Sequence, residues 1–481
     1  MNHAAIRYAV GSLIALLALF MLIPLLFAVA AGEKTVAAFA WPVGVSLALG
    51  LLLRRGGSSG ELGVHEAMVI VSAGWTCAAI AGAFPFVLSG TLPDPVDALF
   101  EAVSGITTTG ATAFLDVERL PRSILLWRAL LNWLGGLGIV VLFVSLLPRP
   151  GIGGVQLMKA EMPGMTAEKL RPRIRETGRL LWGLYVVLTL LLFVLLWAVG
   201  IPFFDAAAHA LATVSTGGVS TRNASIAAFG NPWAEALITF FMLLGATHFG
   251  LLYRFVRRGE VGALVKNREF QTMIGVIGVA AALIAWDLWR TGDAPFAVAW
   301  RLALFQAVAV VSTTGFAAAD YTTWTPAAVA VLTTLMFTSG MAGSTSGGPK
   351  MIRIAIALKY GVFAVRRLLH PRAISPMRLG ELTVSDQLAA AACGFLFFYL
   401  SVAAVSLVIL SFAGLDLVTT GSMVIASLGN IGPGLGAVGP SGSYGFLPAW
   451  VKLYLSFLML VGRLEIYSVL VLFLPSFWAR K

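Results

Sequence analysis

The chain has 481 residues, of which 59% are hydrophobic and only 11% are charged, and its mean hydropathy is +0.90. A soluble globular protein could not bury this much apolar surface, so the composition predicts a protein embedded in lipid. The net charge of +11 would suggest nucleic acid in a soluble chain, but here the basic residues cluster in loops between apolar runs, and we expect no nucleic-acid partner.

Apolar runs of the length that crosses a membrane recur along the chain. A bilayer core of about 30 Å requires roughly 20 helical residues. Ten candidate runs lie at 9–31, 38–53, 66–89, 124–147, 180–200, 232–253, 272–289, 326–358, 388–414 and 448–475. The first run resembles a signal peptide because Ala28-Val29-Ala30 suits a cleavage site, but its apolar core is long, which favours a retained helix. The run at 326–358 is too long for one unbroken span.

Lys and Arg predict the orientation in the membrane. They cluster at 54–55, 149–179, 254–268, 359–378 and 480–481. The positive-inside rule places these segments, and both termini, in the cytoplasm of a multi-pass protein of the cell membrane.

A short phrase of apolar, hydroxyl and glycine residues occurs four times, each time between two apolar runs. The copies lie at 103–112, 212–220, 310–316 and 426–434, and their matched glycines are Gly110, Gly217, Gly315 and Gly432. All four copies face the same side by the charge rule, which indicates parallel internal repetition. Ser, Thr and Gly also pack helices in membranes, but four copies in register favour a shared function.

Each copy follows an apolar stretch of about ten residues, which spans about 15 Å of helix, or half a membrane. Asp97, Asp205 and Asp416 are predicted to cap the starts of these stretches. The pattern predicts four re-entrant half-helices whose negative C-terminal ends meet at one axis, followed by extended backbone. Carbonyl oxygens there can replace the hydration shell of a cation, and without a ring of Asp or Glu we expect a monovalent one.

The predicted ion-binding residues come from the ends of the four phrases. They are Thr108, Thr109, Gly110, Ser215, Thr216, Gly217, Thr313, Thr314, Gly315, Asn430, Ile431 and Gly432.

These phrases, the stretch Ala342–Lys350 and Gly462-Arg463-Leu464-Glu465 resemble the Trk/Ktr/HKT superfamily of potassium transporters, most closely its TrkH branch. The resemblance implies an all-α polytopic membrane protein with four parallel helix–pore-loop–helix repeats around one pore, as in potassium channels, preceded by two extra N-terminal transmembrane helices. The implied units are a helix pair at 1–60 and repeats at 61–150 (pore loop 97–114), 151–268 (pore loop 205–220), 269–370 (pore loop 300–317, gating loop 338–349) and 371–481 (pore loop 416–434).

The resemblance also implies a function and partners. It implies potassium uptake with K⁺ held at the filter residues, and Gly110 stands where Ser is associated with sodium preference in plant relatives. A homodimer in membrane lipid and a cytosolic, nucleotide-binding TrkA-type (RCK) regulatory protein are implied partners. No G-x-G-x-x-G with a suitable acidic residue is present, so we expect the nucleotide on that partner and no organic cofactor in this chain.

A gate is expected in the third repeat. Small polar residues, glycines and Pro349 between 338 and 349 should break the helix, although a simple kink is an alternative. The resemblance makes this the gating loop and makes Arg463 an electrostatic barrier in the pore; an ion pair between Arg463 and Glu465 is the alternative. The predicted gating residues are Gly340, Gly343, Ser344, Thr345, Ser346, Gly347, Gly348, Lys350 and Arg463.

Other functions remain open. A Na⁺/K⁺ transporter of the same fold is one alternative, and an ion-coupled secondary transporter of another solute is a second, although the latter class usually has inverted repeats. An intramembrane enzyme is not expected, because the five histidines form no catalytic or HExxH motif; His209 and His248 are interpreted as packing or hydrogen-bonding residues. The sequence does not distinguish passive flow from proton or sodium symport.

Overall fold

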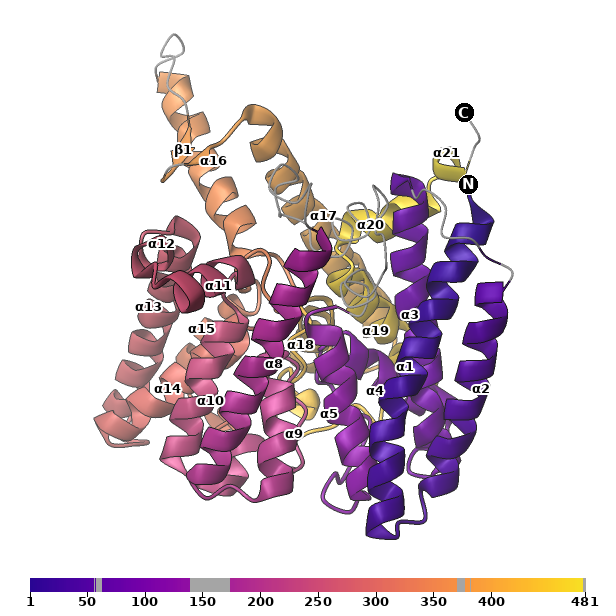
Figure 1. Cartoon of the computed structure of the whole chain (residues 1–481). Coiled ribbons are helices and arrows are strands. Elements are labelled where there is room, and N and C mark those ends of the chain that lie inside the picture. Colours follow the sequence, from indigo (N-terminus) through magenta and orange to yellow (C-terminus); the bar gives the residue numbers. More distant parts are fainter. Residues whose placement is uncertain (56, 58–62, 139–173, 370–376, 381, 479–481) are drawn as a thin grey trace.

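A pair of helices opens the chain and stands at one flank of the molecule (Figure 1). In this computed structural model, which describes residues 1–55, 57, 63–138, 174–369, 377–380 and 382–478, α1 (His3–Ala31) and α2 (Val36–Arg55) pack along their length. A Cβ atom added to Gly11 or Gly50 would lie 2.7 Å from the other's carbonyl oxygen. The two glycines therefore let the helix backbones touch, as small residues do in membranes.

Four units of the same design follow. Each begins with a long helix: α3 (Val64–Leu88), α8 (Ile174–Ala198), α13 (Arg268–Arg290) and α17 (Asp386–Ser411). Each continues with a short apolar helix: α4 (Pro95–Ile106), α9 (Phe203–Val214), α14 (Phe296–Val311) and α18 (Leu417–Leu428). Each then enters a second helix: α5 (Arg122–Gly136), α10 (Pro232–Gly245), α15 (Pro326–Leu335) and α19 (Ala449–Arg463).

The second helices stop after 10 to 15 residues. The chain bends by 109° between α10 and α11 (Phe249–Arg258), and by 115° between α19 and the segment that begins with α20 (Ile466–Leu470). Fifteen non-helical residues separate α15 from α16 (Met351–Leu369), which confirms the predicted break in the third repeat. The prediction of single unbroken spans at 232–253 and 448–475 is wrong.

Glycine residues allow α5, α10 and α19 to contact the short helices of their own repeats. A Cβ atom added to Gly135 or Gly462 would overlap the carbonyl oxygen of Ile106 or Leu428, the last residues of α4 and α18. The equivalent atom on Gly245 would lie 3.2 Å from the Val214 carbonyl oxygen at the end of α9. Glycine thus brings α5, α10 and α19 against the C-terminal ends of their short helices.

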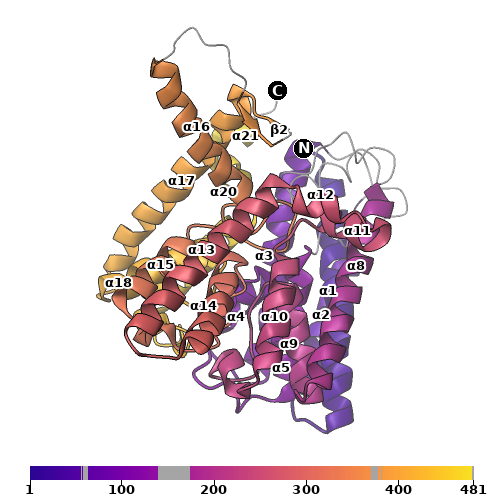
Figure 2. The ribbon, with the colours of Figure 1, turned by 90° about the vertical axis from the view of Figure 1, so that its left-hand side faces the viewer.

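Six helices of the described residues are long and apolar enough to span a membrane, or eight if each bent pair counts as one span. They account for eight of the ten predicted runs; the run at 124–147 contains α5 and then leaves the described residues, and the run at 326–358 contains α15, the break and part of α16. The N-terminus and the last described helix, α21 (Pro475–Trp478), lie at the same end of the molecule, and α16 and α17 project there (Figures 1 and 2). The predicted all-α class is confirmed.

The remaining elements are short. They include the 3-10 helices η2 (Ser225–Phe229), η3 (Tyr321–Thr323), η4 (Gly436–Val438) and η5 (Val471–Phe473). Two short α-helices are α12 (Val261–Val265) and α21 (Pro475–Trp478). The antiparallel pair consists of β1 (Arg378–Leu379) and β2 (Leu382–Thr383). In that pair Arg378 faces Thr383 and Leu379 faces Leu382.

Candidate functional site: a ring of four backbone segments

The starts of the short helices differ from one repeat to another. Asp416 caps α18 by accepting the Thr419 N–H at 2.9 Å, as predicted, whereas Asp94 caps α4 by accepting the Val96 N–H at 2.8 Å. The prediction that Asp97 and Asp205 are caps is wrong. Both lie in the first turn of their helices, where each carboxylate binds a basic side chain.

The ends of the short helices, by contrast, follow one backbone pattern. A non-glycine residue adopts positive φ two positions after each helix: Thr108 (55°), Thr216 (53°), Thr313 (56°) and Asn430 (52°). Two positions further on, a glycine does so: Gly110 (81°), Gly218 (70°), Gly315 (77°) and Gly432 (99°). Left-handed backbone at four non-glycine residues costs about 1 kcal/mol or more each, and such strain concentrates at functional sites.

This pattern corrects the register of the second repeat. The residue between each positive-φ pair donates its N–H to the helix: Thr109 to Ser104, Gly217 to Ala212, Thr314 to Ala309 and Ile431 to Ala426, at 2.8–2.9 Å. Gly218, not Gly217, is therefore equivalent to Gly110, Gly315 and Gly432, and Ser215 is equivalent to the helix-capping Thr107. The sequence aligned the wrong member of the Gly217-Gly218 pair, because only the backbone dihedral angles distinguish the two.

The four segments meet in one closed ring. A Cβ atom added to Gly110 would overlap the Gly217 carbonyl oxygen, and one added to Gly218 would overlap that of Thr314. In the same way Gly315 faces the Ile431 carbonyl oxygen, and Gly432 faces that of Thr109. Each repeat thus contacts the next, and the fourth contacts the first, through glycines that leave no room for a side chain.

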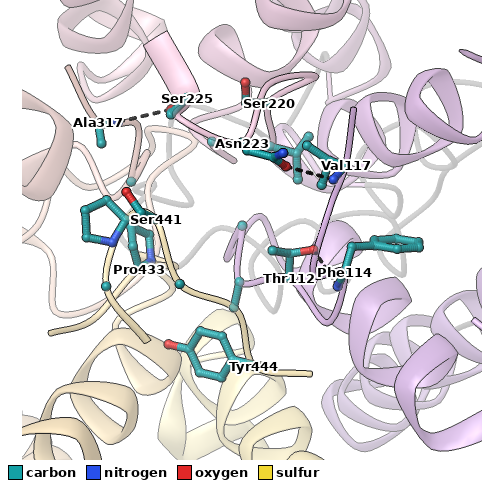
Figure 3. Close-up of a pocket in the computed structure, with 18 of the residues that line it drawn as sticks. Thr112, Phe114, Val117, Ser220, Asn223, Ser225, Ala317, Pro433, Ser441 and Tyr444 are labelled. Carbon is teal, nitrogen blue, oxygen red and sulfur yellow. Dashed lines mark hydrogen bonds between the residues drawn. The ribbon is translucent and has the colours of Figure 1, made fainter. Parts of the chain in front are cut away.

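One end of the ring opens into a cavity of about 90 Å³. Figure 3 shows residues of all four repeats around it, among them Thr112, Ser220, Ala317 and Tyr444. At its rim, Asn223 donates a hydrogen bond to Asp116 at 2.8 Å, which lowers the pKa of the Asp116 carboxyl below its usual value. Asp116 therefore stays negative at neutral pH beside the opening.

The loop between α15 and α16 lies at the other end of the ring. Its Gly347 N–H donates to the Thr313 hydroxyl at 2.8 Å, and the Thr345 hydroxyl lies 3.2 Å from that of Thr216. A smaller cavity of about 40 Å³ is lined by this loop, by the end of α5 and by Arg463. The loop is therefore attached directly to the segments that form the ring.

Arg463 crosses this region from the end of α19. Its guanidinium donates to the carbonyl oxygens of Thr345 in the loop, at 2.7 Å, and of Gly135 and Gly136 in α5, at 2.6 and 2.7 Å. Glu465 forms its ion pair with Arg353 of α16. The side chain of Arg463 thus connects the first, third and fourth repeats beneath the ring.

The other predicted gating residues all lie in the loop. Ser344 and Ser346 share a hydrogen bond of 2.9 Å, and the buried Lys350 ammonium donates to the Ser346 carbonyl at 2.6 Å. Positive φ occurs at Gly343 and Gly348, and Gly340 packs against Ala246 in the break after α10. His248 caps α11 by accepting the Leu251 N–H.

Several residues of the site were not predicted. Glu269 of α13 accepts the N–H groups of Ala342 and Ile352, at 2.8 and 3.1 Å, and so holds both ends of the loop. Tyr444 donates its hydroxyl to the Gly432 carbonyl oxygen at 2.8 Å. Glu101 and Arg128 form a buried ion pair beside the cavity of about 90 Å³ at the open end of the ring, called the mouth cavity below. Charged residues in or beside apolar runs were the available signal for Glu269, Glu101 and Arg128.

The ring presents backbone oxygens rather than carboxylates, and no group of three His, Cys, Asp or Glu among the described residues could hold a metal ion. The fold and ring define a polytopic all-α membrane protein with four parallel helix–loop–helix repeats around one axis.

Comparisons with known proteins identify the family. The TrkH family model, described as a cation transport protein, matches residues 37–279 and 291–480. The Trk system potassium uptake proteins TrkH of Halomonas elongata and Escherichia coli K12 are each 37% identical, with 100% and 99% of this chain and 100% of each relative aligned. The crystal structure of the potassium transporter TrkH from Vibrio parahaemolyticus matches with a TM-score of 0.90 at 33% identity over 100% of both chains. The chain belongs to the TrkH family.

Proposed function

We propose that this chain is a TrkH-type potassium uptake protein that conducts K⁺ across the cell membrane. The observation that carries the proposal is the closed ring, in which Gly110, Gly218, Gly315 and Gly432 each face a carbonyl oxygen of the next segment. The relatives named as potassium uptake proteins support the same ion.

The chemistry of the ring suits a dehydrated monovalent cation. Backbone carbonyl oxygens can replace the water around K⁺, and the C-terminal ends of four half-helices add negative potential at the axis. The filter segments contain no Asp or Glu, which a divalent ion would favour. We place the ion at residues 108–110, 216–218, 313–315 and 430–432, and we propose no organic cofactor in this chain.

The loop at 338–349 is proposed to be the gate. It contacts the ring segments at Thr313 and Thr216, and Arg463 places a positive charge beside it. A fixed cation in the path repels a passing K⁺, so the closed arrangement combines a steric and an electrostatic barrier. Opening requires the loop to release its bonds to Thr313, Thr216 and Arg463.

We further propose a homodimer in a bacterial inner membrane, with both termini cytoplasmic, controlled by a nucleotide-binding TrkA-type protein. The basic last turns of α2, α11 and α16 support this orientation through the positive-inside rule. The basic segments 149–179, 254–268 and 359–378 are the candidate docking surfaces for that protein, and the first of them lies largely outside the described residues.

Tracer rubidium flux into proteoliposomes of the purified full chain tests the proposal, with K⁺ and Na⁺ as competitors. We expect K⁺ to compete at far lower concentrations than Na⁺. Equal competition by the two ions would contradict potassium selectivity and favour a Na⁺/K⁺ transporter. The absence of flux, with or without a TrkA-type regulator, would contradict conduction.

A further inference from the structure

A buried ion pair lies beside the mouth of the ring. The Glu101 carboxylate of α4 and the Arg128 guanidinium of α5 are 2.7 Å apart, with only 2% and 3% of their side chains exposed. Removing two charges from water is costly unless further hydrogen bonds satisfy them. Such a pair therefore requires specific partners around it.

Those partners belong to the backbone that leaves the ring. Glu101 accepts the Thr112 hydroxyl at 3.0 Å and the Ala113 N–H at 2.9 Å. Arg128 donates to the Thr112 hydroxyl at 3.1 Å and, across the repeat boundary, to the Ser220 carbonyl oxygen at 3.2 Å. Thr112 and Ser220 both stand two positions after a ring glycine, Gly110 or Gly218.

Glu101 occupies a position that recurs in every repeat. Glu101, His209, Gln306 and Met423 each precede their ring glycine by nine residues. His209 lies 2.9 Å from the Ser220 hydroxyl, and Gln306 donates to the Phe316 carbonyl oxygen at 3.4 Å. Three of the four residues thus hold the segment leaving their own ring glycine, while the thioether of Met423 is at most a weak acceptor.

The network is concentrated on one half of the ring. Ser220 is held twice, through its carbonyl oxygen by Arg128 and through its hydroxyl by His209. His209 Nδ1 donates to the Asp205 carbonyl oxygen, so the neutral ring accepts the Ser220 hydroxyl at Nε2. On the opposite half, the neutral hydroxyls of Tyr444 and Tyr321 hold Gly432 and Gly434.

We propose that Glu101, Arg128 and His209 are positioning residues that fix the spacing of the first two filter segments and thereby set the preference for K⁺ over Na⁺. This inference rests on the proposed function. A supporting shell that prevents the carbonyl oxygens from closing around a smaller ion penalises Na⁺ without contacting it. A network of charged groups loses more interaction free energy than neutral contacts do when one partner moves. It therefore holds the backbone more firmly.

The test replaces both charges together, Glu101→Met with Arg128→Met, so that no buried charge remains unpaired. In rubidium flux assays we expect the preference for K⁺ over Na⁺ to fall by about tenfold or more, because specificity is a difference between two affinities. The matched control is Glu235→Met with Arg301→Met, a pair of α10 and α14 at 3.4 Å that does not line the mouth cavity. That control should keep the wild-type preference.

A second set of variants keeps both charges. Thr112→Val removes the hydroxyl shared by Glu101 and Arg128, and Thr112→Ser restores it; His209→Leu removes the bond to Ser220, and His209→Gln restores a polar partner. We expect the apolar variants to lose preference and the polar ones to regain it. The inference is overturned if Thr112→Val and His209→Leu are folded and as selective as the wild type, even if the Met pair does not fold. A wild-type protein without potassium preference defeats the proposed function instead.

Discussion

Two adjacent glycines serve different purposes in the second of the four segments that form the ring. Gly218 has φ of +70°, and the space where its Cβ would lie is taken by the Thr314 carbonyl oxygen. Gly217 is absent from the positive-φ glycines, but a Cβ atom there would overlap the side-chain amide of Asn132. Gly218 lets the ring close, and Gly217 lets α5 pack against the outside of the ring.

Gly218→Ala should therefore abolish potassium-selective flux. The methyl group must displace a ring carbonyl, and the left-handed backbone adds about 1 kcal/mol of strain. The matched control is Gly230→Ala, where φ is +53° but no atom lies within 4 Å of an added Cβ. That variant carries the backbone strain alone and should keep its selectivity. Rubidium flux with K⁺ and Na⁺ competition measures both, and selective flux through Gly218→Ala would contradict the ring.

Arg463→Gln should raise rubidium flux in the absence of the regulator by about tenfold. A unit charge a few ångströms from a passing cation costs about 1 kcal/mol or more, and glutamine keeps donors for the Thr345 carbonyl oxygen without that charge. Arg463→Lys keeps the charge and should leave the unstimulated flux low. Equal unstimulated flux in Arg463→Gln and the wild type would remove the electrostatic barrier from the mechanism.

Among single residues, the sequence predicted those that lie within the four repeated motifs of hydroxyl and glycine residues. Thr108, Gly110, Gly315 and Gly432 were predicted because their neighbours recur in all four copies, and all four adopt the positive φ angles of the ring segments. The sequence did not identify Glu101 or Tyr444, because their partners are backbone groups that approach only after folding. The four residues at the position of Glu101 also differ in type, so no repeated residue marked that position.

At the scale of elements, the sequence predicted the interruption between α15 and α16 but not those after α10 and α19. The first contains several glycines and Pro349, which locally disfavour helix. The other two interruptions follow single glycines, Gly245 and Gly462, inside runs that remain apolar on both sides. At these two places the bend results from the packing of a short helix against the second helix. Local helix propensity contains no information about that contact.

The loop between α15 and α16 is held at both ends by the carboxylate of Glu269. Glu269→Leu leaves the N–H groups of Ala342 and Ile352 without this acceptor, at a cost of about 1–3 kcal/mol for a buried group. We expect faster hydrogen exchange across 338–350 and higher flux without the regulator.

Glu269→Gln provides the matched control, because its amide oxygen can still accept both N–H groups. It should behave like the wild type in exchange and in flux. If Glu269→Leu exchanges as slowly as the wild type, the carboxylate does not hold the loop closed.

At the scale of the whole molecule, four units in one chain form a ring only if the fourth returns to the first. Several bonds make this closure, including Asn430 Nδ2 to the Thr109 hydroxyl at 3.0 Å and the Tyr444 N–H to the Thr112 carbonyl oxygen at 2.8 Å. The repeats in the sequence predicted a ring. The particular residues that close it could not be predicted, because they lie more than 300 positions apart.

The buried Lys452 of α19 closes the same boundary through an ion pair with Asp97 of α4, and it also donates to the Gly445 carbonyl oxygen at 3.1 Å. Lys452→Met leaves a mostly buried carboxylate without its cation, which should cost about 3 kcal/mol and lower the Tm of the purified protein. Asp97→Asn added to Lys452→Met should recover most of that loss, because no charge then remains unpaired. Arg119→Met, which breaks an exposed ion pair with Asp116, should cost less than about 1 kcal/mol. If the single Lys452 variant unfolds at the wild-type Tm, the first and fourth repeats do not depend on this pair to close the ring.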